Sequence, residues 1–171
     1  MANVLIQLIK SRDLSGVLAM ASSPLLTGTL TPEGDTCLHL AVKSDHVDMI
    51  VLLASLTANN HMIDLVNNDG QTPLITACRT HPGFVSQGVI RALVGLGANV
   101  NANYLVKRML AARWYDETND WDLEGDFYDI SPLALASKRG EIDLVHFLME
   151  RGARFWTSDL SDLVHHSIAF D

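Results

Sequence analysis

The sequence predicts an all-α solenoid built from short helix–turn–helix units that stack side by side. Three segments of the chain share one pattern of a hydroxyl residue, a leucine and an alanine at fixed spacing. Each of them is followed by a second apolar stretch, and two of these stretches end in Gly-Ala. A unit of this size cannot bury both of its faces alone, so neighbouring units must share one continuous core.

The hydroxyl residues predict where the first helix of each unit begins. Thr36, Thr72 and Ser131 are placed to cap a helix N-terminus. Pro73 and Pro132 follow at the first helical position, where a missing N–H costs nothing. The leucine two residues after each cap faces the shared core, and the alanine five residues after it lets two helices approach closely. The second helices are expected at residues 47–53, 89–96 and 142–149.

The spacing of the caps predicts where extra residues lie. Thr36 and Thr72 are 36 residues apart, whereas Thr72 and Ser131 are 59 apart. About four extra residues belong to a turn near His81, and about 22 precede Ser131. Residues 4–10 and 14–21 fit two N-terminal helices, and Ser158 can cap a last one. We expect a single domain, 1–171, divided into an N-terminal capping repeat with its link (1–33), a repeat (34–68), a repeat (69–102), an insertion (103–128), a repeat (129–156) and a C-terminal capping helix (157–171).

These residues resemble the ankyrin repeat, whose hallmark is a Thr-Pro-Leu-His-x-Ala run in units of about 33 residues. The resemblance covers roughly residues 3–153. It implies an all-α ankyrin-repeat solenoid of about three recognisable repeats, capping units at both ends and one long insertion. It also implies a non-enzymatic module for protein–protein interaction.

The net charge of −8 is concentrated in one segment. Residues 116–129 hold seven acids and no base, and the rest of the chain holds 12 bases and 13 acids. The low pI therefore describes the insertion and not the whole surface. Nucleic acid remains an unlikely partner because no nucleic-acid-binding motif occurs.

Cysteine content and hydropathy predict a soluble protein of the cell interior. Cys37 and Cys78 are too few for a disulfide framework. The apolar start of the chain lacks the basic residues of a signal peptide, and no apolar run approaches the ~18 residues of a membrane helix. We expect a cytoplasmic protein, with the nucleus as a second compartment, and no membrane partner.

Motifs for catalysis and metal binding are weak. Cys37 and His39 lie two residues apart, so on one helix they face different directions. His165 and His166 are adjacent and make a poor metal pair. The stretch from Asp120 resembles a calcium loop, but its twelfth position is a serine. We expect no enzyme activity, cofactor, resident metal or small-molecule substrate; the acidic stretch stays open as a calcium loop, a solvated loop or a partner-binding finger.

The insertion is the first candidate binding site. Its first part, residues 104–115, has helical character, and its second part is acidic. Loops longer than about 12–15 residues in compact domains are usually functional or disordered. Aromatic residues favour an interface anchor over disorder, although the rings can instead fold back over the exposed edge of the repeats. The candidate partner-binding residues here are Trp114, Tyr115, Trp121, Asp122, Phe127 and Tyr128.

The second candidate is a column of basic residues on the expected concave face. The residue seven after each cap position is basic in every unit, and Arg139 lies beside the end of the column. Either these are ordinary solvated positions, or they form a groove for an acidic partner segment, for which the acidic insertion of the same chain can compete. The column residues are Lys10, Lys43, Arg79 and Lys138.

Two stretches carry a narrower resemblance. The segments 34–42 and 63–74 look like the first two repeats of the inhibitor-of-NF-κB family, which includes short viral mimics. That resemblance implies binding of a Rel-type transcription factor through loop tips and the concave face. The small number of repeats, the insertion and the lack of an acidic tail depart from the family. The alternatives are an adaptor of another pathway (substrate-recruiting or host-targeting), a structural piece of a larger assembly, and a metal-binding or enzymatic protein built around the insertion.

Overall fold

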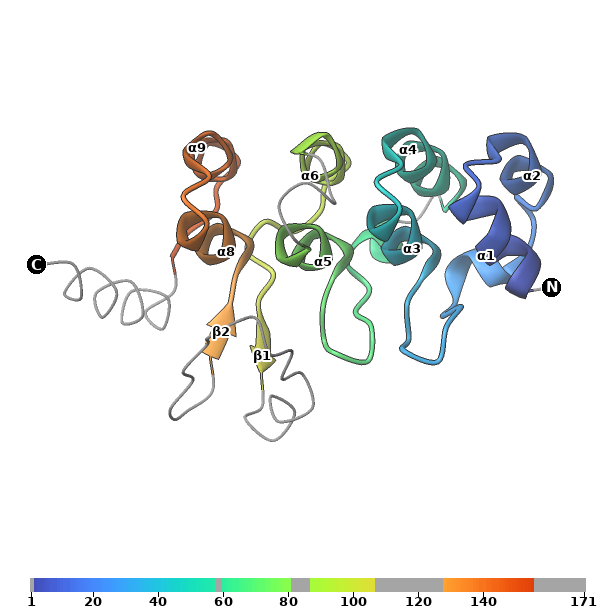
Figure 1. Cartoon of the computed structure of the whole chain (residues 1–171), viewed down its shortest axis with the longest axis horizontal. Helices are drawn as coiled ribbons and strands as arrows, with labels where there is room; N and C mark the ends of the chain where they lie inside the picture. Colours follow the sequence, from blue (N-terminus) through green and yellow to red (C-terminus); the bar gives the residue numbers. More distant parts are fainter. Residues whose placement is uncertain (1, 58–59, 81–86, 107–127, 156–171) are drawn as a thin grey trace, which may run out of the picture.

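The computed structural model describes residues 2–57, 60–80, 87–106 and 128–155. Within them, helices pair into stacked units (Figure 1). The sequence-based prediction of an all-α ankyrin-type solenoid is confirmed. The pairs are α1 (Ala2–Lys10) with α2 (Leu14–Ala19), α3 (Cys37–Lys43) with α4 (Val47–Leu56), α5 (Pro73–Arg79) with α6 (Gln87–Gly95), and α8 (Pro132–Lys138) with α9 (Ile142–Glu150).

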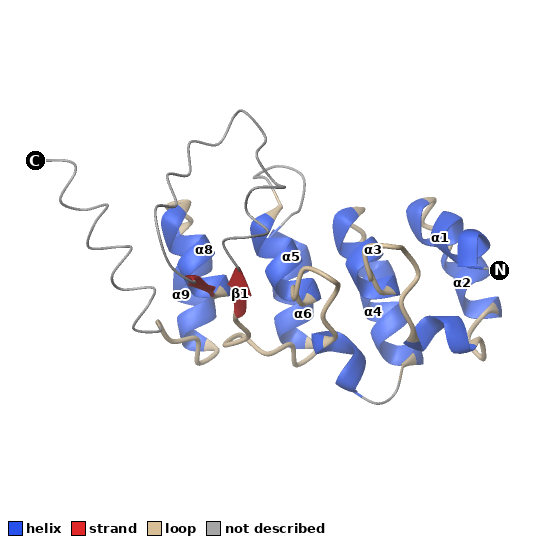
Figure 2. Cartoon of the chain, turned by 90° about the horizontal axis from the view of Figure 1, so that it is seen from below, coloured by secondary structure: helices blue, strands red, loops and turns tan. Residues whose placement is uncertain are grey.

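The helices form two rows. The inner row consists of α1, α3, α5 and α8, each in contact with the next, and the outer row consists of α2, α4, α6 and α9 (Figure 1). The loops before α3 and α5 project from the inner row, away from the outer helices. Seen from that side, the four inner helices lie side by side (Figure 2). One apolar cluster runs through every pair.

The inner helices begin at the predicted caps. Side-chain oxygens of Thr36, Thr72 and Ser131 accept hydrogen bonds from the backbone N–H three residues later, at 3.5, 3.2 and 3.1 Å. Each cap has extended backbone. In the N-terminal unit the outer helix α2 is capped instead, by the Asp13 carboxylate, which accepts from the N–H of Gly16 at 2.9 Å. Local hydrogen bonding therefore fixes the register of each unit before any packing is considered.

The turns between paired helices differ in length. Three residues separate α3 from α4 and α8 from α9, whereas seven separate α5 from α6. The four extra residues are those that the sequence placed near His81, although residues 81–86 themselves lie outside the described part. Two 3₁₀ helices, η1 (Pro24–Thr27) and η2 (Asn60–Asp64), lie in the links that lead to α3 and α5.

The prediction of helix from residue 104 is wrong at its start. Tyr104–Val106 forms strand β1, which pairs antiparallel with β2, Tyr128–Ile130. Both ends of the insertion must return to one place between α5 and α8, and a two-stranded ladder satisfies their backbone groups. Tyr, Val and Ile also favour strands. Residues 107–127, which include the rest of that expected helix, and the expected capping helix at 157–171 lie outside the described residues.

Among the residues that the structure describes, no helix is both long and apolar enough to cross a bilayer.

Candidate protein-interaction surface

The side of the inner row that carries the projecting loops is built from two tight fingers. Finger 1 is residues 29–36 and finger 2 is residues 65–72. In finger 1 the N–H of Leu30 donates to the carbonyl of Asp35 at 2.7 Å; in finger 2 the N–H of Asn67 donates to Gln71 at 3.0 Å. A side-chain oxygen closes each turn, because Thr31 and Asn67 accept from the backbone N–H four residues later. Both fingers are therefore rigid supports for exposed side chains.

The two fingers also bind each other. The Asn68 amide donates to the carbonyl of Pro32 at 2.8 Å, and its backbone N–H donates to Glu33 at 3.0 Å. Gly34 allows this approach, because a Cβ there would lie 2.8 Å from the backbone nitrogen of Asn68. Gly34 also has a φ of +78°, where L side chains are strained. The side chains of Leu65 and Val66 are left exposed on finger 2.

A buried carboxylate joins finger 1 to the inner helices. Asp35 is only 3% exposed. One of its oxygens accepts from the ammonium group of Lys43 at the end of α3, and the other accepts from the Asn67 amide at 3.2 Å. Because Lys43 reaches Asp35, the last residue of α3 lies on the finger side of its helix. A half-exposed lysine therefore neutralises a carboxylate that burial would otherwise destabilise.

His39 connects the first unit to the second. Its Nδ1 accepts from the backbone N–H of Thr36 at 3.3 Å, and its Nε2 lies 2.9 Å from the carbonyl of Gln71. A carbonyl only accepts, so Nε2 carries the proton and the ring is neutral. Burial lowers the pKa of His39, while the bond to Gln71 opposes this. His39 therefore ties the start of α3 to the finger of the next unit.

The structure brings the predicted basic residues into a row. Lys10, Lys43, Arg79 and Lys138 are the last residues of the four inner helices, and all four are exposed. We call these four residues the basic column. Each also lies at the negative end of a helix dipole, which stabilises a cation there.

Arg139 extends the column across a unit boundary. Its guanidinium donates to the carbonyl of Arg79 at 2.5 Å and lies 4.0 Å from the carboxylate of Glu141. The ends of α5 and α8 are therefore adjacent. A chain of cations at helix ends suits a carboxylate-rich segment lying along the inner row.

The aromatic and acidic candidates cannot be placed. Trp114, Tyr115, Trp121, Asp122 and Phe127 lie outside the described residues. Of Tyr128 only the backbone is described, as the residue of β2 opposite Val106. The acids of the stretch that resembles a calcium loop, residues 120–126, also lie within the undescribed segment.

The outer row carries a second group of cations. The guanidinium carbons of Arg91 and Arg151 lie 4.3 and 5.1 Å from the ring centre of Phe147. Cation–π contacts at exposed sites contribute roughly 0.5–1 kcal/mol. Because these arginines lie on the helices opposite the fingers, they provide a charge-matched comparison for the basic column.

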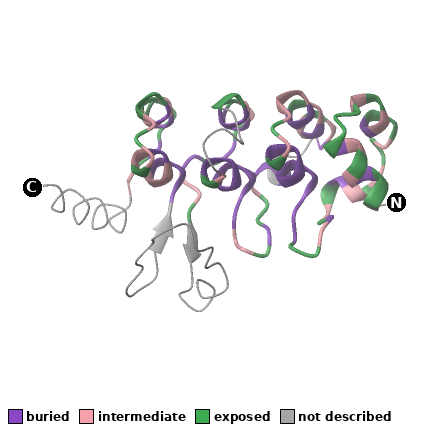
Figure 3. Cartoon of the chain, in the orientation of Figure 1, coloured by how far each residue is buried: buried purple, intermediate pink, exposed green. Residues whose placement is uncertain are grey.

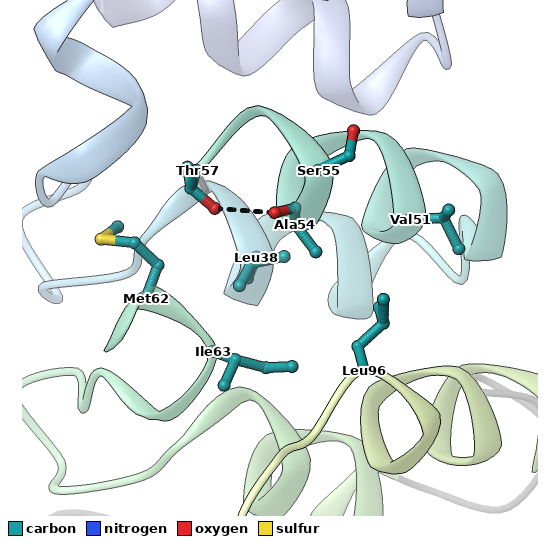
Figure 4. Close-up of a pocket in the computed structure, with 8 residues that line it drawn as sticks. All are labelled: Leu38, Val51, Ala54, Ser55, Thr57, Met62, Ile63 and Leu96. Carbon is teal, nitrogen blue, oxygen red and sulfur yellow. Dashed lines mark hydrogen bonds between the residues drawn. The ribbon is translucent and has the colours of Figure 1, made fainter. Parts of the chain in front are cut away.

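An apolar hollow of about 150 Å³ lies between α4, η2 and the end of α6 (Figure 4). Its hydroxyls are satisfied within their own helix, since Thr57 donates to the carbonyl of Leu53 at 2.9 Å and Ser55 to that of Leu52 at 2.7 Å. Small-molecule pockets usually measure about 300–1,000 Å³ and carry convergent polar groups. We interpret the hollow as a packing gap between outer helices.

Both cysteines are buried in the repeat core. Burial raises the pKa of the Cys37 thiol to about 11 and that of Cys78 to about 12. The Cys37 thiol donates to the carbonyl of Leu26 at 3.3 Å. Since the thiolate is the reactive form, both side chains act as small core residues.

Sequence reasoning missed the contribution of the asparagines. Asn67 and Asn68 hold the fingers together, and Asn101 accepts from the N–H of Arg154 at 2.9 Å while donating to Gly152 at 3.0 Å. The signal was present as Asn67-Asn68 within finger 2 and as Asn99, Asn101 and Asn103 just before β1. Asparagine often caps its own backbone in turns, but its reach to a neighbouring unit appears only once the units are stacked.

Stacked helix pairs with fingers along one side define a class of repeat proteins. The family model for ankyrin repeats (3 copies) matches residues 5–104. The chain belongs to the ankyrin-repeat family, and this membership indicates a protein–protein interaction module. The match begins within α1 and ends at β1. The α8–α9 unit lies outside the matched residues, and the structure shows that it is a further helix pair of the same array.

Proposed function

We propose that the chain is an adaptor or regulator that binds an acidic segment of a partner protein along the finger side of the inner row. The observation that carries this proposal is the basic column, one cation at the end of each inner helix. Opposite charges steer association and fix the register of a bound segment. The exposed apolar side chains of finger 2 add a contact outside the column.

The geometry supports an extended ligand in particular. The column follows the row of inner helices, and hydrogen bonds close the fingers at its side, so a bound segment meets a preorganised surface and the free-energy cost of ordering that surface is small. Asp35 holds Lys43 in place, and the Arg79 carbonyl holds Arg139. The insertion, which leaves the array through β1 and returns through β2, gives a partner a second surface in this proposal.

A fluorescent ten-residue glutamate peptide tests the proposal. We expect the full chain to bind it with an affinity that falls steeply as salt rises. The variant K10E/R79E/K138E should lose roughly tenfold or more of that affinity. It spares Lys43, whose loss would disturb Asp35 and the fold.

The matched control is R91E/R151E/R154E, which changes the net charge equally at exposed positions outside the column. It should bind within about twofold of the parent chain, because rim charges away from an interface act only through the general field. Equal losses in both variants would mean that net charge alone draws the peptide. Thermal unfolding of each variant verifies that the fold is retained.

A finer proposal is that the partner is a Rel-type transcription factor and the chain an inhibitor of the NF-κB-inhibitor kind. The resembling segments, 34–42 and 63–74, form finger 1 with α3 and finger 2 with the start of α5. Most of their side chains are buried, so the resemblance supports the repeat architecture more strongly than the choice of partner.

Binding to a purified Rel-homology domain tests this finer proposal separately. Leu65, Val66 and Asn68 are the exposed residues of the two segments on finger 2. The variant L65S/V66S should weaken a Rel complex while leaving the glutamate peptide bound. Absence of any Rel complex, with the peptide still bound, leaves the adaptor proposal and removes the inhibitor.

A further inference from the structure

The two ends of a repeat array differ from its middle, because an end unit has a neighbour on one side only. The helices α8 and α9 form the last described unit, and Figure 3 shows α3 almost wholly buried while α8 is not. Comparing equivalent positions identifies which face of the last unit is open. The inner helices are compared by their distance from the cap, and the outer helices by their distance from the Gly-Ala that ends each unit.

On the inner helices the difference lies on one side. His39 and Ile75 are buried three residues after their caps, whereas the equivalent Ala134 is half-buried. Six residues after the caps, Cys78 is buried and Ser137 is half-buried. The hydroxyl of Ser137 is buried and has no hydrogen-bond partner in the described part of the chain. A buried polar atom of this kind is costly unless another segment satisfies it.

The outer helices show the same pattern. Ile90 and Val94 on α6 are 4% and 7% exposed. Their equivalents on α9 are Val145, which is half-buried, and Met149, which is 52% exposed; one turn earlier, Ile142 is 67% exposed. These three side chains lie on one stripe of α9, because they follow helical spacing.

We propose that this open face, formed by Ala134, Ser137, Val145 and Met149, is a docking surface for the C-terminal segment of the same chain, residues 156–171. The face is called the end face below. The last described residues, 152–155, are held next to the end face. Asn101 hydrogen-bonds to Gly152 and Arg154, and the side chain of Phe155 packs against the core. The segment therefore starts beside the surface that it covers, and its effective concentration there is high.

The sequence of the segment fits this role. Leu160, Leu163, Val164 and Ile168 recur at the spacing of one helical stripe, and Ser158 precedes them as a cap. Leu160 follows Ser158 by two residues, as Leu38, Leu74 and Leu133 follow their caps. A helix of about 11 residues would be roughly 16 Å long, longer than the seven-residue α8.

Only five residues separate Gly152 from Ser158, too few for another finger. The docked segment would thus close the core without extending the row of fingers. It adds an end to the solenoid and no new part to the partner-binding surface, so this inference stands independently of the proposed function.

Cysteine labelling of the full chain tests the docking. Met149→Cys places a reactive thiol on the end face, and Glu150→Cys places one on the neighbouring exposed position as a control. The native cysteines react slowly because burial raises their pKa to about 11 and 12. Maleimide labelling of each variant is followed by mass spectrometry.

We expect the Met149→Cys thiol to react at least about tenfold more slowly than the Glu150→Cys thiol, because a docked segment must first open. Adding L160D/V164D, on the apolar stripe, should abolish this protection. Adding H165D/A169D, which contributes the same charge on the opposite side of the expected helix, should leave it intact.

Fast labelling at Met149→Cys in every background would overturn the proposal, because the face would then be open. Slow labelling that survives L160D/V164D and weakens on dilution would also overturn it, because a second copy of the chain would then be the occupant.

Discussion

Two junctions between units solve the same packing problem with different chemistry. Between α3 and α5 the contact is a buried polar network centred on Asp35, His39 and Asn67. Between α5 and α8 the position of His39 is taken by Ile75, and an exposed bond from Arg139 to the carbonyl of Arg79 links the two helix ends. Polar networks fix one register, whereas apolar contacts tolerate change. The insertion enters at the second junction, between α5 and α8.

The largest expected effect is at Asp35. Asp35→Ala removes the acceptor of Lys43 and leaves the Asn67 amide buried without its partner, so we expect a loss of about 2–4 kcal/mol in the free energy of unfolding. Glu141→Ala at the other junction should cost less than about 1 kcal/mol, because its carboxylate lies 4.0 Å from Arg139. Urea denaturation measures both. Equal costs at the two sites would contradict the difference between the junctions.

The second effect concerns the approach of the fingers. Gly34→Ala should cost about 1–3 kcal/mol, since it combines a φ of +78° with a clash against the backbone of Asn68. Gly28→Ala is the control, because a Cβ at Gly28 meets nothing within 4 Å and its φ is −114°. Thermal unfolding of the two variants checks this, and an unaffected Gly34→Ala variant would show that the fingers can separate freely.

The third effect is a dependence on pH. Because burial lowers the pKa of His39, the unfolded chain binds a proton more readily than the folded chain. The contribution of neutral His39 to the free energy of unfolding is fully present above the pKa of an unfolded histidine, about 6.5. It is lost as the pH falls from there towards the lower pKa of His39 in the folded chain, by at most about 1.4 kcal/mol per pH unit.

His39→Ile, which copies the second junction, should be less stable at pH 7.5 yet lose less stability on acidification. Denaturation at pH 7.5, 6.5 and 5.5 measures these slopes. An unchanged slope in His39→Ile would assign the pH dependence to other groups.

The smallest effect is at Arg139. Arg139→Met removes an exposed hydrogen bond and should cost less than about 1 kcal/mol. Lys43→Met at the first junction should cost more, because it leaves the buried Asp35 carboxylate without its cation. Chemical denaturation of the pair ranks the two junctions directly, and the reverse order would contradict our assignment.

Local signals in the sequence predicted much of this structure. Hydroxyl caps, N1 prolines and the leucine–alanine spacing act within one unit, so Thr36, Thr72 and Ser131 could be placed from sequence alone. The basic column was also predictable, because one residue at a fixed offset from each cap must recur along a stack of units.

Features that depend on two units at once were not predictable. The bonds of Asn68 to finger 1 and of Asn101 to Gly152 and Arg154 join residues 35 to 53 positions apart. The start of the insertion was misread for the same reason, because the partner that makes Tyr104–Val106 a strand, Tyr128–Ile130, lies on the far side of the insertion.

The central claim is that the finger side of the inner row, and not the outer row, receives an acidic partner. Titration of the isotope-labelled full chain with the ten-residue glutamate peptide, followed by backbone amide NMR, tests it most directly. We predict shifts at the C-terminal ends of α1, α3, α5 and α8, which diminish as salt rises. Shifts confined to α4, α6 and α9, around Arg91 and Arg151, would contradict the account.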